Sequence, residues 1–149
     1  MDKEKEIRKV VEKIKLAEKK GNYDSIRKYL LEKRLNWYEK NKDSLNISGS
    51  EVRKAYQLIL IHYLKLNKNE VPIVYEDKKK IIWHSYNWCP LIDACKRINV
   101  DTRKACKEGW EESVQKLIEK VHPKLKFSRN YEILRPHGNY CEEMAELLD

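Results

Sequence analysis

Apolar residues recur at helical spacing through residues 1–66. The stripe in residues 2–20 predicts an amphipathic helix that ends at Gly21-Asn22. Asp24 and Ser50 are expected to be the N-caps of a second and a third helix, because both residue types favour that position. The side chains expected to face inward are Ile7, Val10, Val11, Ile14 and Ala17 in the first helix, Ile26, Tyr29, Leu30 and Trp37 in the second, and Val52, Tyr56, Ile59, Tyr63 and Leu66 in the third.

The period of the pattern changes after residue 70. Residues 71–75 and 80–86 are rich in β-branched and aromatic side chains, and the polar stretch between them predicts a hairpin. Pro90 suits the first position of a helix whose N-cap would be Cys89. A further helix is expected to begin after Asp101 and to end before Pro123. A second hairpin is predicted to join residues 125–134 to residues 139–147.

These elements predict an α+β fold, with helices packed on a small antiparallel sheet made of two hairpins. The length of 149 residues fits a single domain, with a helical part in residues 1–70 and a part in residues 71–149 that carries the site. No stretch is apolar enough to span a membrane, and the first residues hold no apolar signal segment. We therefore expect a cytoplasmic protein without a membrane partner.

The chain is basic, with a formal net charge of +8. Residues 1–50 carry 14 Lys and Arg against 9 Asp and Glu, and these charges interleave as they do on a solvated helix face. No nucleic-acid-binding motif accompanies them, so we do not expect a nucleic-acid partner. In a cytoplasmic protein the four cysteines are expected to be free, catalytic or metal-bound rather than paired in disulfides.

Cys89 is the candidate nucleophile. Free backbone N–H groups and the dipole at the start of a helix favour a thiolate there. His84 lies five residues upstream and could act as the base. The alternative is a helix-capping thiol without chemistry. Cys95 and Cys106 lie on apolar helical stripes, where a thiol usually acts as a small hydrophobic side chain.

Strand alternation in the second hairpin places two charged residues on core-facing sides. Arg129 shares its face with Phe127, Tyr131 and Ile133, whereas Glu143 shares its face with Cys141, Ala145 and Leu147. A charge on such a face must be paired or must line a polar cavity. Two interpretations remain open: a structural ion pair between Arg129 and Glu143, or a pocket in which Arg129 binds a substrate carboxylate.

The spacing of the cysteines does not match the paired cysteines of structural zinc sites. We therefore expect no cofactor. A dispersed zinc site formed by Cys89, Cys141 and His137 stays open as an alternative.

Four short motifs carry a family resemblance: residues 87–95, residues 101–106, residues 123–127 and residues 140–143. Over residues 71–149 the chain resembles the aminothiazoline-carboxylate hydrolase-like family and its small relatives. The family activity opens a cyclic aminothiazoline carboxylate by hydrolysis. The resemblance implies a site that includes Asn87, Cys89, Cys106, Cys141 and Glu143.

The expected function is cysteine-dependent hydrolysis of a C–N or C–S bond in a small carboxylated substrate. Cys89 would attack the amidine-like carbon, and His84 or Glu143 would move protons. Arg129 would hold the carboxylate, Asn87 would donate a hydrogen bond to the developing charge, and Cys141 would contact the substrate. The alternative is a small-molecule-binding or metal-binding protein that catalyses no reaction.

Overall fold

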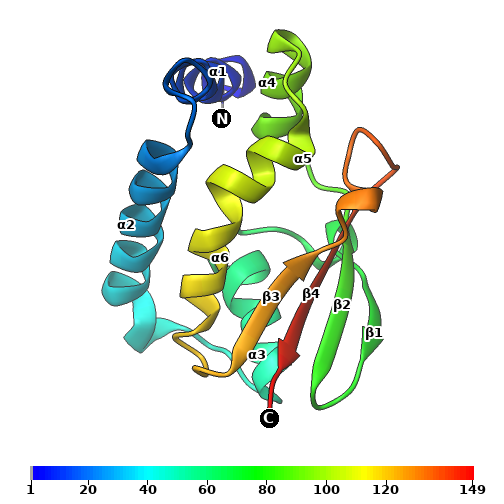
Figure 1. The fold of residues 1–149 in the computed structure, drawn as a ribbon. Helices are drawn as coiled ribbons and strands as arrows, with labels where there is room; N and C mark the ends of the chain where they lie inside the picture. Colours follow the sequence, from blue (N-terminus) through cyan, green and yellow to red (C-terminus); the bar gives the residue numbers. More distant parts are fainter. Residues whose placement is uncertain (1) are drawn as a thin grey trace.

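The computed structural model describes residues 2–149 and confirms the α+β fold. Four strands form one antiparallel sheet in the order β1-β2-β4-β3 (Figure 1). Each predicted hairpin contributes two neighbouring strands, and the hairpins join through β2 and β4, where Ser85 lies opposite Cys141. The strands are β1 (Ile73–Glu76), β2 (Lys80–Ser85), β3 (Leu125–Arg129) and β4 (Cys141–Leu147).

The helices lie mostly where the apolar pattern predicts them. Asp2 caps α1 by accepting a hydrogen bond from the Lys5 N–H, and Gly21 ends α1 in the left-handed conformation at φ 79°. Ser50 caps α3, and Cys89 and Asp101 occupy the N-cap positions of α4 and α5. The α-helices are α1 (Lys3–Lys20), α2 (Asp24–Asn41), α3 (Glu51–Tyr56), α4 (Pro90–Ile98), α5 (Thr102–Ala105) and α6 (Glu111–Ile118), and short 3₁₀ turns cover Lys42–Ser44, Lys68–Glu70 and Tyr131–Ile133.

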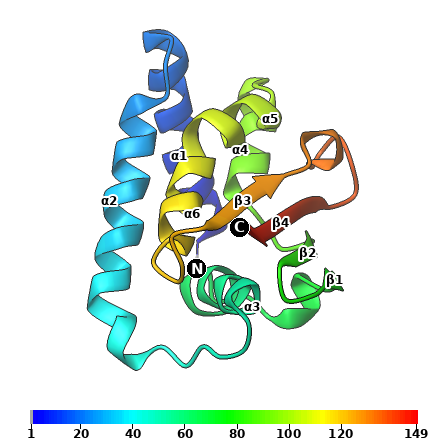
Figure 2. The ribbon, with the colours of Figure 1, turned by 60° about the horizontal axis from the view of Figure 1, so that its bottom comes forward.

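The second helix differs from the prediction in two respects. Tyr23, not Asp24, occupies the N-cap position of α2. Tyr29 is 45% exposed, whereas Arg34 is buried. The inner face of α2 is decided by its packing against α6 and the segment before α6 (Figure 2), so the buried stripe continues from Leu30 to Arg34 instead of including Tyr29.

Two helices contain π-helical segments that the sequence did not predict. The helix that begins as α3 continues as a π-helix over Gln57–Tyr63, and a second π segment, Cys106–Trp110, connects α5 to α6. A π segment changes the direction of the side chains that follow it and is common at functional sites. Here the two segments bring Tyr63 and Cys106 to the wall of the same cavity.

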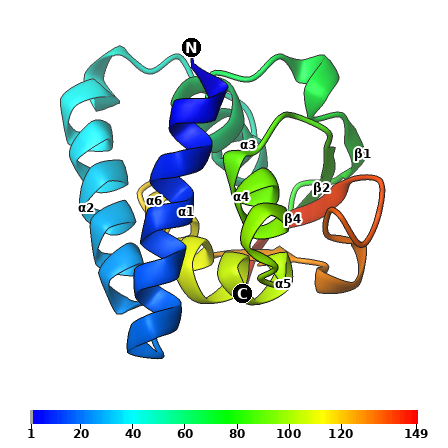
Figure 3. The same ribbon diagram turned by 90° about the horizontal axis from the view of Figure 1, so that it is seen from above.

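The helices cover one face of the sheet in two groups. The first group consists of α3 with its π segment and of α6. These helices pack on the inward side chains of the strands, among them Ile81, Trp83 and Phe127, and form one core with them. A second apolar cluster lies at the end of the sheet, where α1 packs beside α4 and α2 (Figure 3). No helix within residues 2–149 is long and apolar enough to cross a membrane.

The second hairpin is shorter than predicted. β3 ends at Arg129, and Tyr131–Ile133 forms a 3₁₀ turn, so Tyr131 and Ile133 do not continue the strand face of Arg129. The turn begins because the Asn130 side chain accepts a hydrogen bond from the Glu132 N–H. This local bond competes with the strand ladder.

Candidate functional site

A cavity of about 350 Å³ lies between the two apolar clusters. Its walls come from α1, α2, the two π segments, the start of α4 and the ends of β2, β3 and β4. Three of the four cysteines line it, namely Cys89, Cys106 and Cys141. The cavity therefore brings together several of the residues that the sequence predicted for the site.

Arg129 and Glu143 form the predicted ion pair inside this cavity. Arg129 Nε lies 3.1 Å from Glu143 Oε2, and each side chain is only 11% exposed. Ser85 donates a hydrogen bond of 2.7 Å to the other carboxylate oxygen. Burial alone would lower the pKa of Arg129, but the acidic groups of Cys106 and Glu143 outweigh it and the pKa is raised. Arg129 is therefore a permanent cation on the cavity wall.

The ion pair leaves part of Arg129 unused. Its Nη1 atom is buried and has no hydrogen-bond partner within residues 2–149. A buried charged donor without an acceptor is unfavourable, and native proteins usually provide a partner. The structure thus confirms the ion pair through Nε, whereas the interpretation of Arg129 as a carboxylate receptor stays a prediction.

Cys89 lies on the cavity wall at the start of α4, as predicted. Burial raises the pKa of its thiol, and the backbone N–H groups of Leu91 and Ile92 lower it by less. The helix start thus acts in the expected direction, but desolvation is the larger effect. The expectation that Cys89 rests as a thiolate is therefore corrected, since the structure favours the neutral thiol.

His84 is not brought to Cys89. On β2 the side chain of Ser85 points into the cavity, so its neighbour His84 points to the opposite face of the sheet. There His84 Nε2 lies 2.9 Å from Glu142 Oε2, and the imidazole stacks on Tyr140 with the ring centroids 3.9 Å apart. The proposed pairing of His84 as base with Cys89 is thus wrong, because strand alternation separates them.

Asn87 and Cys141 do meet at the cavity, and the residue that joins them is Arg135. Arg135 Nη1 donates to the Asn87 carbonyl oxygen at 2.6 Å, and Arg135 Nε donates to Cys141 Sγ at 3.3 Å. The Asn87 amide itself donates to the Trp88 carbonyl oxygen at 3.2 Å. Sequence analysis missed Arg135, since no local pattern indicates that the loop folds back over residue 87.

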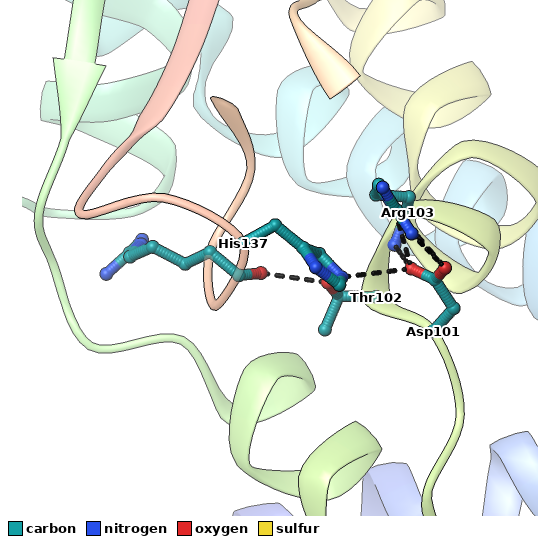
Figure 4. Close-up of polar contacts among 5 residues, drawn as sticks. Asp101, Thr102, Arg103 and His137 are labelled. Atoms are coloured by element: carbon teal, nitrogen blue, oxygen red, sulfur yellow. Dashed lines mark hydrogen bonds and ion pairs between the residues drawn. The ribbon is translucent and has the colours of Figure 1, made fainter. Parts of the chain in front are cut away.

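His137 lies apart from the cysteines. Its Nε2 atom is 3.3 Å from Asp101 Oδ1, and Figure 4 shows the imidazole directed at that carboxylate. The neighbouring Thr102 hydroxyl donates to the Arg135 carbonyl oxygen at 2.8 Å, so both contacts hold the 130–140 loop against the start of α5. Within residues 2–149 no three His, Cys, Asp or Glu side chains are grouped as metal ligands, and the suggested set of Cys89, Cys141 and His137 does not come together.

Arg34 and Cys106 are site residues that the sequence interpretation did not assign from their spacing. Arg34 lies on the buried stripe of α2, four residues after Leu30. The sequence pattern that could have indicated it is a charged residue at the spacing of an otherwise apolar helix stripe. Cys106, interpreted from spacing as structural, faces the cavity, and burial raises its pKa to about 12. All four cysteines are free thiols in the structure.

The comparisons with known proteins matched no protein-family model, no curated protein and no solved structure. The resemblance to the aminothiazoline-carboxylate hydrolase-like family stays a prediction from its four motifs. Function is therefore argued from the cavity itself.

Proposed function

We propose that the protein binds a small carboxylated molecule in the cavity between the two apolar clusters. The observation that carries this proposal is the buried Nη1 atom of Arg129, which has no acceptor within residues 2–149. Glu143 holds the guanidinium through Nε, and Ser85 in turn fixes Glu143, so the Arg129 side chain is oriented before a ligand arrives. A preorganised guanidinium is the usual receptor for a carboxylate in proteins.

The remaining walls suit the body of a small organic molecule. The volume of about 350 Å³ falls at the lower end of the range of ligand sites. Leu30, Trp88 and Trp110 provide apolar and aromatic surface on the walls. An apolar pocket with a few convergent polar groups is the common design of a small-molecule site.

Hydrolysis of the bound molecule is a second candidate, favoured by the thiols of Cys89, Cys106 and Cys141 on the cavity wall. In this hypothesis the Cys89 sulfur attacks the carbon of a C–N or C–S bond, that bond breaks as the departing nitrogen or sulfur takes up a proton, and water then releases Cys89. Glu143 replaces His84 as the proton acceptor, because Glu143 faces the cavity and His84 does not. The raised pKa of Cys89 means that attack requires transfer of the thiol proton during the reaction.

Intrinsic fluorescence tests the binding proposal, because Trp88 and Trp110 line the cavity. The probes are 2-aminothiazoline-4-carboxylate and a series of simple carboxylates. The variant Arg129→Gln/Glu143→Gln removes both charges of the pair together, so neither residue is left buried and charged without the other. We expect this variant to lose carboxylate binding by about tenfold or more, since a charge-assisted hydrogen bond disappears.

The matched control is Arg53→Gln/Glu76→Gln, which removes an exposed Arg–Glu pair between α3 and β1. It should bind as the wild type does. Equal affinity in the Arg129 and Glu143 double variant would overturn the proposal. Product formation from 2-aminothiazoline-4-carboxylate that disappears in Cys89→Ala, while binding persists, would add the hydrolase activity.

A further inference from the structure

Arg34 is the second buried arginine of the cavity, and it comes from a different part of the chain than Arg129. It lies in the middle of α2, is only 9% exposed, and makes no ion pair within residues 2–149. Its Nε atom is buried without a hydrogen-bond partner in the same range. Its guanidinium lies 5.3 Å from the centre of the Tyr63 ring, a cation–π contact that holds the group in the cavity wall.

The two arginines share one environment. Burial lowers the pKa of Arg34, Tyr63 opposes that effect, and the positive charge of Arg129 lowers the pKa further. Two guanidinium groups that repel each other across a buried cavity are unfavourable unless an anion compensates them. Glu143 compensates only one of them, and its two oxygens are already engaged by Arg129 and Ser85.

The cavity wall carries an excess of positive charge. Arg34, Arg129 and Arg135 contribute three positive charges, and Glu143 is the acidic group that faces them. Arg135 is held by Asn87 and Cys141, neither of which carries a compensating charge in its neutral form. Two negative charges are therefore required to neutralise this wall.

The mouth of the cavity also carries a net positive charge. Lys9 and Lys13 of α1 and Lys33 of α2 line it, whereas Glu6 is the acidic residue beside them. Lys13 Nζ lies 3.7 Å from the centre of the Tyr29 ring, a contact that joins α1 to α2 beside the cavity. A mouth of one sign attracts ligands of the opposite sign and raises their association rate.

We propose that the ligand of this cavity is a small dicarboxylate, with one carboxylate on Arg129 and the other on Arg34. The inference rests on the proposed function and adds to it the number of anionic groups. The receptors are the guanidinium groups of Arg129 and Arg34, because both side chains line the cavity and each has a buried donor without a partner within residues 2–149.

Calorimetric titration of the full chain tests the inference with matched pairs of probes. Malonate, succinate, glutarate and adipate are compared with propionate, butyrate, pentanoate and hexanoate, which have the same chain lengths and one carboxylate fewer. We expect at least one dicarboxylate to bind about tenfold or more tightly than its monocarboxylate partner. In Arg34→Met and Arg34→Gln that preference should disappear, while monocarboxylate binding at Arg129 persists.

The control variant is Lys28→Met, which removes one positive charge from the exposed side of the same helix. It should keep the preference for dicarboxylates. Thermal melts of both Arg34 variants establish that they fold. Monocarboxylate binding without a preference for dicarboxylates, or a preference that survives the loss of Arg34, would overturn the inference and leave the proposed function standing.

Inorganic phosphate is the competing probe. If phosphate binds in an Arg34-dependent manner and none of the dicarboxylates does, the dicarboxylate assignment is wrong. If no carboxylate of either series binds, the proposed function fails together with the inference.

Discussion

The ion pair between Arg129 and Glu143 gives the sharpest prediction for stability. Replacing Glu143 by Gln removes the carboxylate that compensates a buried guanidinium, and both side chains are only 11% exposed. Breaking a buried pair by removing one partner costs about 3–5 kcal/mol. For a chain of this size that loss lowers the melting temperature by roughly 6–20 °C. With a slope near 2 kcal/mol per molar urea, the unfolding midpoint falls by about 1.5–2.5 M.

The neighbouring residue on the same strand provides the control. Glu142 points to the opposite face of the sheet and pairs with His84 through a side chain that is 29% exposed. Glu142→Gln should therefore cost less than about 1 kcal/mol. Adding Arg129→Gln to Glu143→Gln should recover most of the lost stability, since the uncompensated charge is removed with its partner.

Equilibrium urea unfolding of the four proteins, with the slope checked for constancy, measures these differences. A Glu143→Gln variant within about 1 kcal/mol of the wild type would refute the reasoning, because Arg129 would then not depend on this carboxylate. The absence of any recovery in the double variant would show that the loss came from packing or from the Ser85 hydrogen bond instead.

Three further predictions follow from the same cavity. Arg34→Met should raise the melting temperature by about 3–6 °C, because it removes an uncompensated buried charge. The control Lys28→Met should leave the melting temperature nearly unchanged. A lowered melting temperature for Arg34→Met would contradict this prediction. Burial raises the pKa of Cys106 to about 12. The folded protein therefore holds this proton more tightly than the unfolded chain does, and stability should fall as pH rises from about 9 towards 12. Cys106→Ala should show a shallower fall in denaturation series across that range, and an unchanged slope would exclude Cys106 as a cause. At pH 8, Cys89 should react with iodoacetamide at least about tenfold more slowly in the native protein than in the urea-unfolded protein, because burial raises its pKa. Mass spectrometry measures both rates. A faster reaction in the native protein would restore the thiolate interpretation.

Local patterns in the sequence determined most of the elements. The caps at Ser50 and Asp101 and the stop at Gly21 were predicted, because each depends on the conformation and hydrogen bonds of a few adjacent residues. Strand alternation also placed Arg129 and Glu143 on inward faces, and their pairing followed from the cost of an unpaired buried charge.

The tertiary structure decided which of these residues share a site. His84 and Cys89 are close in sequence, yet His84 contacts Glu142 of β4 on the face of the sheet opposite the cavity. Arg34 lies 95 positions from Arg129 in sequence, yet both line one cavity, because α2 packs against α6 and the π segment that precedes it. Contacts between distant segments depend on how whole helices pack against the sheet, and no local spacing encodes that packing.

The resting state of Cys89 shows the same division. The sequence correctly determined its place at a helix start, and with it the direction of the helix effect on its pKa. Only the surrounding walls determined how strongly the thiol is desolvated, and that larger effect reverses the result. Desolvation depends on every segment that covers the sulfur, whereas a helix N-terminus is formed by the few residues that follow it.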